Sequence, residues 1–374
     1  MSRAAPSSLS IALLSGFAVL GGCSLPPQGR TPYVPGPEML SVLSEWQSMR
    51  AVPEAGLSPA EARDVPSLQD AARAIPNTHG LAAGATAVPT VHALVATGAS
   101  GPLAARLYLP TAVPAVTKDQ PIIIYFVGGT WVAGSLDGYD ETARQLMART
   151  GWPVVAIRTR LAPEAQFPDA HDDALAAYQW ARKNMRAWGS DPTRVVLAGE
   201  GAGANLAIST ALSAREHKVS VPDYLLLITP LVSTGLSGGS MGESGKSRPL
   251  TRQTVNWAQD LYTKHNRDLS DPRLNPVQRA DLAPLPPTTV ILAEIDPLRT
   301  QGEDMAGALR LAGIPTQSRV FSGVTHDFFG LGLRVPAAAA AEQYAADQMK
   351  ISLRRVGPGP GRVPLRPHRS RRLR

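Results

Sequence analysis

Short, unbroken runs of apolar residues recur along the second two thirds of the chain, separated by more polar segments. Such runs are typical of strands buried on both faces, and the segments between them have the spacing of covering helices. We expect strands at 122–127, 154–158, 195–198, 224–228, 289–293 and 316–321, and helices near 140–150, 170–185, 202–215, 251–264, 300–313 and 336–353. This alternation predicts an α/β fold with a mostly parallel, doubly wound central sheet flanked by helices.

Before this alternation the pattern is weaker. Residues 90–95 and 103–109 are expected to form two strands around a glycine-containing turn. Helical patterns cover 37–49 and 59–73, and in the second Ser58 is placed as the N-cap with proline directly after it. We therefore expect a small helical cap at 38–75, joined by parts of 235–266, on a main domain at 76–353.

The first residues have the features of a bacterial lipoprotein signal. Arg3 provides a positive start, residues 9–20 are apolar but too few to span a bilayer, and Leu-Gly-Gly precedes Cys23. This pattern predicts a signal peptide at 1–22, a lipidated Cys23 and a Pro- and Gly-rich tether at 23–37. We accordingly expect an exported lipoprotein of the cell envelope, bound to the membrane through Cys23. Since the chain has one cysteine, an intramolecular disulfide is excluded.

The basic character of the chain is concentrated at its C-terminal end. The eight arginines after residue 353 outweigh the whole formal net charge of +7, so the rest of the chain is close to neutral. We therefore expect no nucleic acid partner. Residues 354–374 are predicted to be a disordered basic tail, either solubilising or in contact with anionic lipid.

Residues 195–206 carry the strongest local signal in the sequence. An apolar run enters a glycine-rich corner, and small helix-forming residues leave it. This is the pattern of a nucleophile elbow, in which G-x-S-x-G exposes a serine between a strand and a helix. Gly199 and Gly203 match the two framing glycines, but the serine position holds Gly201.

Ordered motifs make residues 90–350 resemble the hormone-sensitive-lipase-like esterases of the α/β-hydrolase fold, with a weaker resemblance over 38–75. The motifs are YFVGGTW at 125–131, RLAPE at 160–164, the elbow, LPP at 285–287, DPLR at 296–299 and GVTHDFF at 323–329. The resemblance implies hydrolysis of carboxylic esters, with Asp296 and His326 as the acid and the histidine of a triad. It assigns the oxyanion hole to backbone N–H groups from Gly128, Gly129, Thr130 and Ala202.

The departures from the family pattern lie in the site itself. Gly201 has no side chain to attack an ester, Val127 replaces a histidine, and Glu200 replaces the usual aspartate. Thr130 takes the place of a glycine, and a β-branched residue resists the positive φ that glycine permits. Loss of the serine costs on the order of 10⁶ in kcat in subtilisin. We therefore expect an ester-hydrolase family member that is catalytically impaired or inactive.

Two alternatives remain open. In the first, His326 with Asp296 activates water directly, giving a weak hydrolase. In the second, the protein binds a small apolar ester or lipid-like ligand without consuming it, or acts as a scaffold at the membrane surface. The serines in the glycine-rich segment, Ser237 and Ser240, lack the strand and helix of an elbow and are expected in a flexible loop. The sequence contains no metal-binding or cofactor-binding motif.

Overall fold

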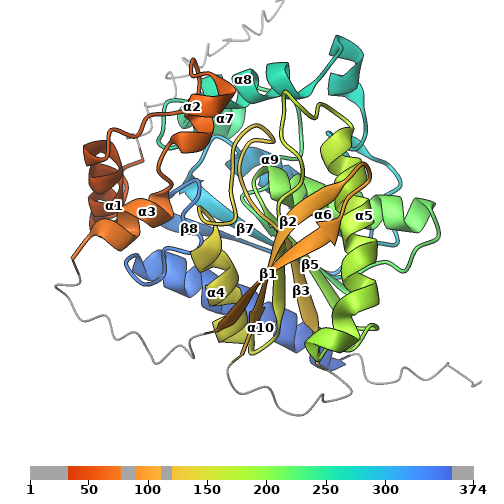
Figure 1. The fold of residues 1–374 in the computed structure, drawn as a ribbon. Helices are drawn as coiled ribbons and strands as arrows, with labels where there is room; N and C mark the ends of the chain where they lie inside the picture. Colours follow the sequence, from red (N-terminus) through yellow and green to blue (C-terminus); the bar gives the residue numbers. More distant parts are fainter. Residues whose placement is uncertain (1–32, 77–88, 111–119, 356–374) are drawn as a thin grey trace, which may run out of the picture. The chain divides into compact units, whose positions relative to one another are not determined.

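A mostly parallel sheet forms the centre of the computed structural model, which describes residues 33–76, 89–110 and 120–355 (Figure 1). Its strand order is β1-β2-β4-β3-β5-β6-β7-β8. Strand β2 pairs antiparallel with β1 and β4, and the other pairings are parallel. The strands are β1 (Thr90–Thr97), β2 (Pro102–Leu109), β3 (Ile122–Phe126), β4 (Val154–Ile157), β5 (Val195–Glu200), β6 (Tyr224–Ile228), β7 (Thr288–Ile295) and β8 (Thr316–Thr325).

Helices cover both faces of this sheet. They are α1 (Pro37–Ser48), α2 (Pro59–Asp64), α3 (Leu68–Ala74), α4 (Asp140–Thr150), α5 (Asp169–Asn184), α6 (Ala202–Glu216), α7 (Gly239–Glu243), α8 (Arg252–Tyr262), α9 (Arg299–Leu311) and α10 (Pro336–Arg355), with 3-10 turns at Met185–Trp188, Asn266–Ser270 and Pro276–Gln278. Helices α4 and α10 lie on one side of the sheet, and α5 and α6 lie on the other (Figure 1). The predicted fold class is confirmed.

The central strands explain why their sequences are apolar without interruption. Along β3, Ile122 and Ile124 pack into the core on one face, whereas Ile123 and Tyr125 pack into the core on the other. All five residues of β3 are buried. Because side chains alternate between faces and both faces are covered, every position of such a strand must be apolar.

The N-terminal helices differ from the sequence prediction. A single helix was expected at 59–73, but α2 ends at Asp64 and α3 begins at Leu68. Pro66 breaks the helix because proline lacks an N–H and disfavours helical geometry at the residue before it. Each helix has its own reciprocal capping box, Ser58 with Glu61 and Ser67 with Asp70, so both starts are encoded locally.

The segment around Ser240 is also more ordered than predicted. Residues 239–243 form α7 rather than a flexible loop, and Ser240 is fully buried. Its hydroxyl donates to the Pro297 carbonyl at 2.8 Å and accepts the Thr300 N–H at 2.9 Å. Both hydrogen-bonding capacities of this serine are therefore used to join α7 to the start of α9.

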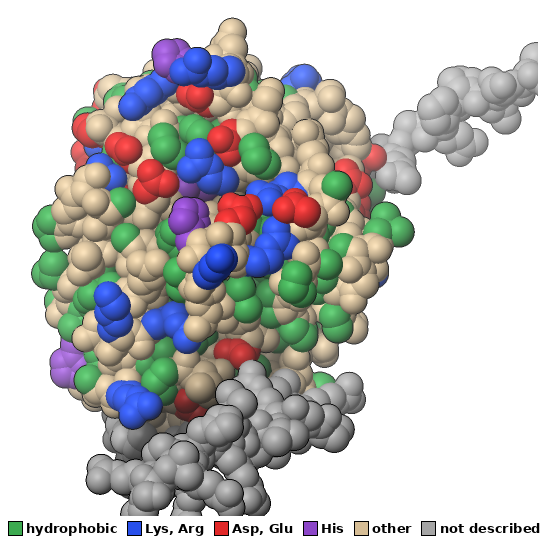
Figure 2. Space-filling model, turned by 90° about the vertical axis from the view of Figure 1, so that its right-hand side faces the viewer, with side chains coloured by type: hydrophobic (Ala, Val, Ile, Leu, Met, Phe, Trp, Pro, Cys, Tyr) green, Lys and Arg blue, Asp and Glu red, His purple; other side chains and the backbone are tan. Residues whose placement is uncertain are grey.

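The predicted signal peptide, Cys23 and most of the tether and of the basic tail lie outside the described residues. Within the described residues, no helix combines the length and apolarity needed to cross a bilayer. On the face shown in Figure 2, acidic and basic side chains lie intermingled. This distribution agrees with a body that is close to neutral.

Candidate active site

The corner between β5 and α6 has the shape of a nucleophile elbow. Strand β5 ends at Glu200, α6 begins at Ala202, and Gly201 joins them with φ 54° and ψ −119°. A Cβ at Gly199 would lie 2.0 Å from the Gly203 carbonyl oxygen, and one at Gly203 would lie 2.3 Å from that of Phe126. Both framing glycines are therefore required by close backbone packing, whatever residue stands between them.

A side chain at Gly201 would point toward His326. An ideal Cβ built there lies 3.5 Å from His326 Nε2 and 3.1 Å from the Gly129 carbonyl oxygen. A serine hydroxyl would thus face the histidine, as nucleophilic catalysis requires. It would also press against Gly129, which would have to shift by a few tenths of an ångström.

Asp296 and His326 are brought together by the ends of neighbouring parallel strands. Asp296 follows β7 and His326 follows β8, and both side chains are buried. His326 Nδ1 lies 2.8 Å from Asp296 Oδ2, while Asp296 Oδ1 accepts the Leu298 N–H at 2.8 Å. The carboxylate therefore orients the ring and fixes Nδ1 as its protonated nitrogen.

A second carboxylate faces the other ring nitrogen. Asp327 Oδ1 lies 3.6 Å from His326 Nε2 and accepts the Tyr139 hydroxyl at 2.9 Å. Asp327 has a left-handed backbone, with φ 60°. Burial lowers the pKa of His326, but the charges of Asp296 and Asp327 outweigh it and raise the pKa to about 9. The ring is therefore an imidazolium at neutral pH.

The predicted oxyanion turn is folded onto itself. Gly129 has φ 119°, and a Cβ there would lie 2.0 Å from the Ala133 carbonyl oxygen. The Ala202 N–H donates to the Gly129 carbonyl at 3.1 Å, and the Thr130 N–H donates to the Ala133 carbonyl at 3.2 Å. Two of the predicted oxyanion donors are therefore bonded within the protein, and the Gly129–Thr130 peptide must turn before they can hold an oxyanion.

Gly128, the first residue of this turn, serves packing. A Cβ there would lie 2.3 Å from the ring of Tyr139, the same residue that donates to Asp327. The small residue lets the tyrosine reach across the turn toward the histidine loop. The oxyanion roles assigned to Gly128, Gly129, Thr130 and Ala202 stay predictions.

Glu54 is a residue of this site that the sequence did not reveal. It lies between α1 and α2, and its Oε2 accepts the Thr130 hydroxyl at 3.0 Å. Burial is the largest influence on the pKa of Glu54 and raises it, as does the charge of Asp327. The Thr130 hydrogen bond and the charge of His326 lower it, and the net pKa is about 7. The contact joins residues 76 positions apart, and a lone acid in a loop carries no local signal of such a contact.

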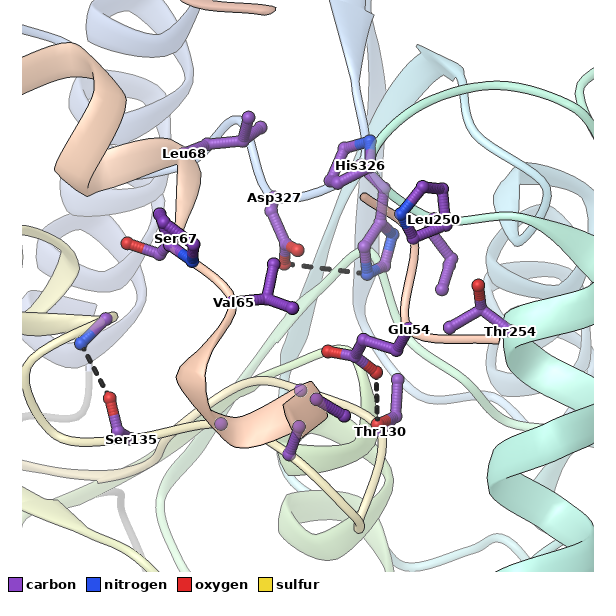
Figure 3. Close-up of a pocket in the computed structure, with 18 of the residues that line it drawn as sticks. Glu54, Val65, Ser67, Leu68, Thr130, Ser135, Leu250, Thr254, His326 and Asp327 are labelled. Carbon is purple, nitrogen blue, oxygen red and sulfur yellow. Dashed lines mark hydrogen bonds and ion pairs between the residues drawn. The ribbon is translucent and has the colours of Figure 1, made fainter. Parts of the chain in front are cut away.

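Glu54, Thr130, His326 and Asp327 line one cavity of about 110 Å³ (Figure 3). The cap contributes one wall, the turn after β3 a second, and residues 249–254 a third. Arg63 also reaches this cavity, but its guanidinium is bonded to Glu164 and to the carbonyls of Val132 and Ala162. Besides Arg63 and Tyr139, the ionisable side chains that line the cavity are therefore Glu54, Asp327 and His326.

Glu200 lies behind the elbow as a buried acid. Tyr125 donates to its Oε2 at 3.3 Å, and within the described residues its Oε1 has no hydrogen-bond partner. Burial, reinforced by the charge of Asp327, raises the pKa of Glu200 well above its ordinary value. No group of three or more His, Cys, Asp or Glu side chains suited to a metal ion occurs in the described part of the chain.

Comparison with known proteins gives the family. The sequence profile of a family described as alpha/beta hydrolase fold matches residues 123–330. The carboxylic ester hydrolase LipN of Mycobacterium tuberculosis is 32% identical over 265 residues, which are 69% of this chain and 69% of that protein. The chain belongs to the hormone-sensitive-lipase-like esterase family of the α/β-hydrolase fold. By family it is a carboxylic ester hydrolase.

Two further relatives extend the comparison. The ethyl acetate hydrolase of Pseudomonas putida is 34% identical over 236 residues, 62% of this chain and 72% of that protein. A crystal structure of a serine-to-alanine mutant of esterase rPPE, complexed with (S)-Ac-CPA, has a TM-score of 0.75 at 26% identity and covers 85% of this chain and 98% of its own. Esterases similar to this chain thus include one crystallised with a ligand after losing a serine.

Proposed function

We propose that this protein is a serine-independent member of the esterase family, which binds a small ester or lipid-like ligand and turns it over slowly, without a covalent acyl-enzyme. The observation that carries the proposal is Gly201, which stands at the elbow with no side chain facing His326. Roughly 10³–10⁴ of the rate enhancement over water survives loss of the triad in a serine protease. A low rate, rather than none, is therefore the expectation.

Gly201 is accompanied by other features of the site that do not suit a serine esterase. The Gly129 carbonyl occupies the Ala202 N–H, and Asp327 faces the histidine nitrogen that would take a serine proton. The first feature removes an oxyanion donor, and the second raises the pKa of the histidine that would act as the base. They also support the second candidate, a non-catalytic binding protein, which would leave its ester ligand intact.

We further propose that Cys23 is lipidated and holds this domain at a membrane of the cell envelope. The pattern of residues 1–23 supports this placement. A lipid anchor would keep the cavity close to apolar and lipid-derived esters.

The first prediction concerns Gly201→Ser. A serine there would place its hydroxyl beside His326, which can accept the serine proton once the ring is neutral. We therefore expect hydrolysis of p-nitrophenyl acetate above pH 9 to rise at least about 100-fold over the wild type. The wild type, Gly201→Ser and Gly201→Ser/His326→Ala are assayed side by side, and the double variant should lose the gain. A wild type as fast as Gly201→Ser would contradict the proposal. Complete absence of turnover in the wild type would favour the binding protein.

A further inference from the structure

We propose that Glu54 is a catalytic residue of this site, acting as the general base that activates water against the ester carbonyl, with His326 as the charged donor to the oxyanion. This inference rests on the proposed function and deepens it. It reverses the roles that the family assigns, because the histidine would no longer be the base.

The position of Glu54 supports this role. Its carboxyl enters the cavity from the cap, opposite His326 and beside the oxyanion turn (Figure 3). One oxygen, Oε2, accepts the Thr130 hydroxyl at 3.0 Å, which holds the carboxyl in place. No hydrogen bond to Oε1 occurs within the described residues, so this oxygen can accept a proton from water.

The carboxylates around His326 also support this division of roles. Asp296 lies 2.8 Å from Nδ1, and Asp327 lies 3.6 Å from Nε2. A ring between two carboxylates already carries both protons at neutral pH. It cannot accept another proton, but its Nε2–H can donate to an oxygen that gains negative charge.

The two pKa values divide the roles. The groups facing Glu54 are Asp327, His326 and the Thr130 hydroxyl, and with burial they place its pKa at about 7. The pKa of His326 is about 9. Between these values Glu54 is ionised while His326 is still charged, which is the combination that a base and an electrostatic stabiliser require.

The reaction balances with water as the only co-reactant. Glu54 takes a proton from water as the water oxygen bonds to the carbonyl carbon, and the carbonyl electron pair moves onto oxygen beside His326 Nε2–H. The tetrahedral intermediate then expels the alkoxide, which takes the proton from Glu54. The products are the carboxylic acid and the alcohol, and Glu54 is regenerated without a covalent intermediate.

The test is the pH dependence of p-nitrophenyl acetate hydrolysis by the full chain from pH 5 to 10. We expect kcat/KM of the wild type to rise with a pKa near 7 and to fall with one near 9. Glu54→Gln should lose about 100-fold at pH 8, within the usual range for a general base, and should lose the rising limb. Glu38→Gln, the same change at an exposed acid of α1, should match the wild type.

Thr130→Val separates a catalytic from a merely structural carboxyl. The Thr130 hydrogen bond lowers the pKa of Glu54, so this variant should move the rising limb to higher pH. Thermal unfolding at pH 8 checks that the variants are folded. The pKa of Glu54 is raised in the folded state, so its ionisation costs stability increasingly between about pH 4.5 and 7, and by the full amount above pH 7. Glu54→Gln removes this cost and should therefore unfold at no lower temperature than the wild type at pH 8.

Three results would overturn the inference. Glu54→Gln could keep the wild-type rate and rising limb, the wild-type rate could rise only near pH 9, or the wild type could show no hydrolysis. The first two leave the serine-independent function standing and remove Glu54 alone. A covalent acyl-enzyme in the wild type would remove the proposed function itself.

Discussion

At the scale of single residues, the site is defined by what surrounds His326. Asp296 orients its Nδ1 as in any such triad, but Nε2, which a side chain at position 201 would face, lies 3.6 Å from Asp327 Oδ1. The sequence predicted the positions of Asp296 and His326 from motifs that follow strands. It could not predict Asp327 or Glu54, because their effect depends on a left-handed backbone residue and on a contact between distant loops.

Asp327→Asn tests the electrostatics directly. Removing the carboxylate near Nε2 should lower the pKa of His326 from about 9 toward its ordinary value. Asparagine tolerates the left-handed backbone and can still accept the Tyr139 hydroxyl, so the fold should be preserved. The measurement is an NMR titration of the His326 ring protons, with the surface variant Glu303→Gln as control. An unchanged pKa of His326 in Asp327→Asn would show that the Asp327 carboxylate does not raise it.

The same residue contributes to the pH dependence of stability. The pKa of His326 is raised in the folded state, so its contribution is fully present below about pH 6.5 and is lost as the pH rises through 9. Asp327→Asn should therefore reduce the loss of stability between pH 6.5 and 9. Urea denaturation of the two proteins at these two pH values measures the difference.

At the scale of elements, the sequence predicted the parallel strands well because both faces of the sheet are covered. The predicted strand at 195–198 was too short, since β5 continues through Gly199 and Glu200, which pair with Leu227 and Ile228. A buried glutamate and a glycine do not look like strand residues. They are accommodated here because the strand must end at the elbow.

The cap shows the opposite limit. Its helices are short, and their ends are decided by Pro66 and by two capping boxes rather than by apolar periodicity. Periodicity alone therefore merged α2 with α3 and missed α7. These short elements matter, because the loop before α2 delivers Glu54 to the cavity.

At the scale of the whole molecule, the fold and the chemistry are separable. Gly199 and Gly203 are held by contacts with neighbouring backbone, so the elbow persists without a nucleophile. The hydrophobic cores on the two faces of the sheet likewise do not depend on a serine at position 201. Family membership thus follows from the scaffold, whereas the reaction depends on a handful of side chains at its edge.

Cys23→Ser tests the proposed placement in the envelope. With the full chain expressed in a bacterium that lipidates such cysteines, we expect the wild type in the membrane fraction with the mass of a diacylated N-terminus. The variant should lack the added mass and leave the membrane fraction. Equal masses and equal distributions would contradict lipidation at this residue.

The most direct test of the central claim is intact-mass spectrometry after treatment with a fluorophosphonate, which reacts with activated serine hydroxyls. We predict that wild-type protein remains unmodified because Gly201 presents no hydroxyl to His326. Above pH 9, where the His326 ring is neutral, Gly201→Ser should gain one phosphonyl adduct, and His326→Ala in that background should prevent it. A wild-type protein that gains a single adduct would contradict the claim, because it would contain the nucleophile that this site is proposed to lack.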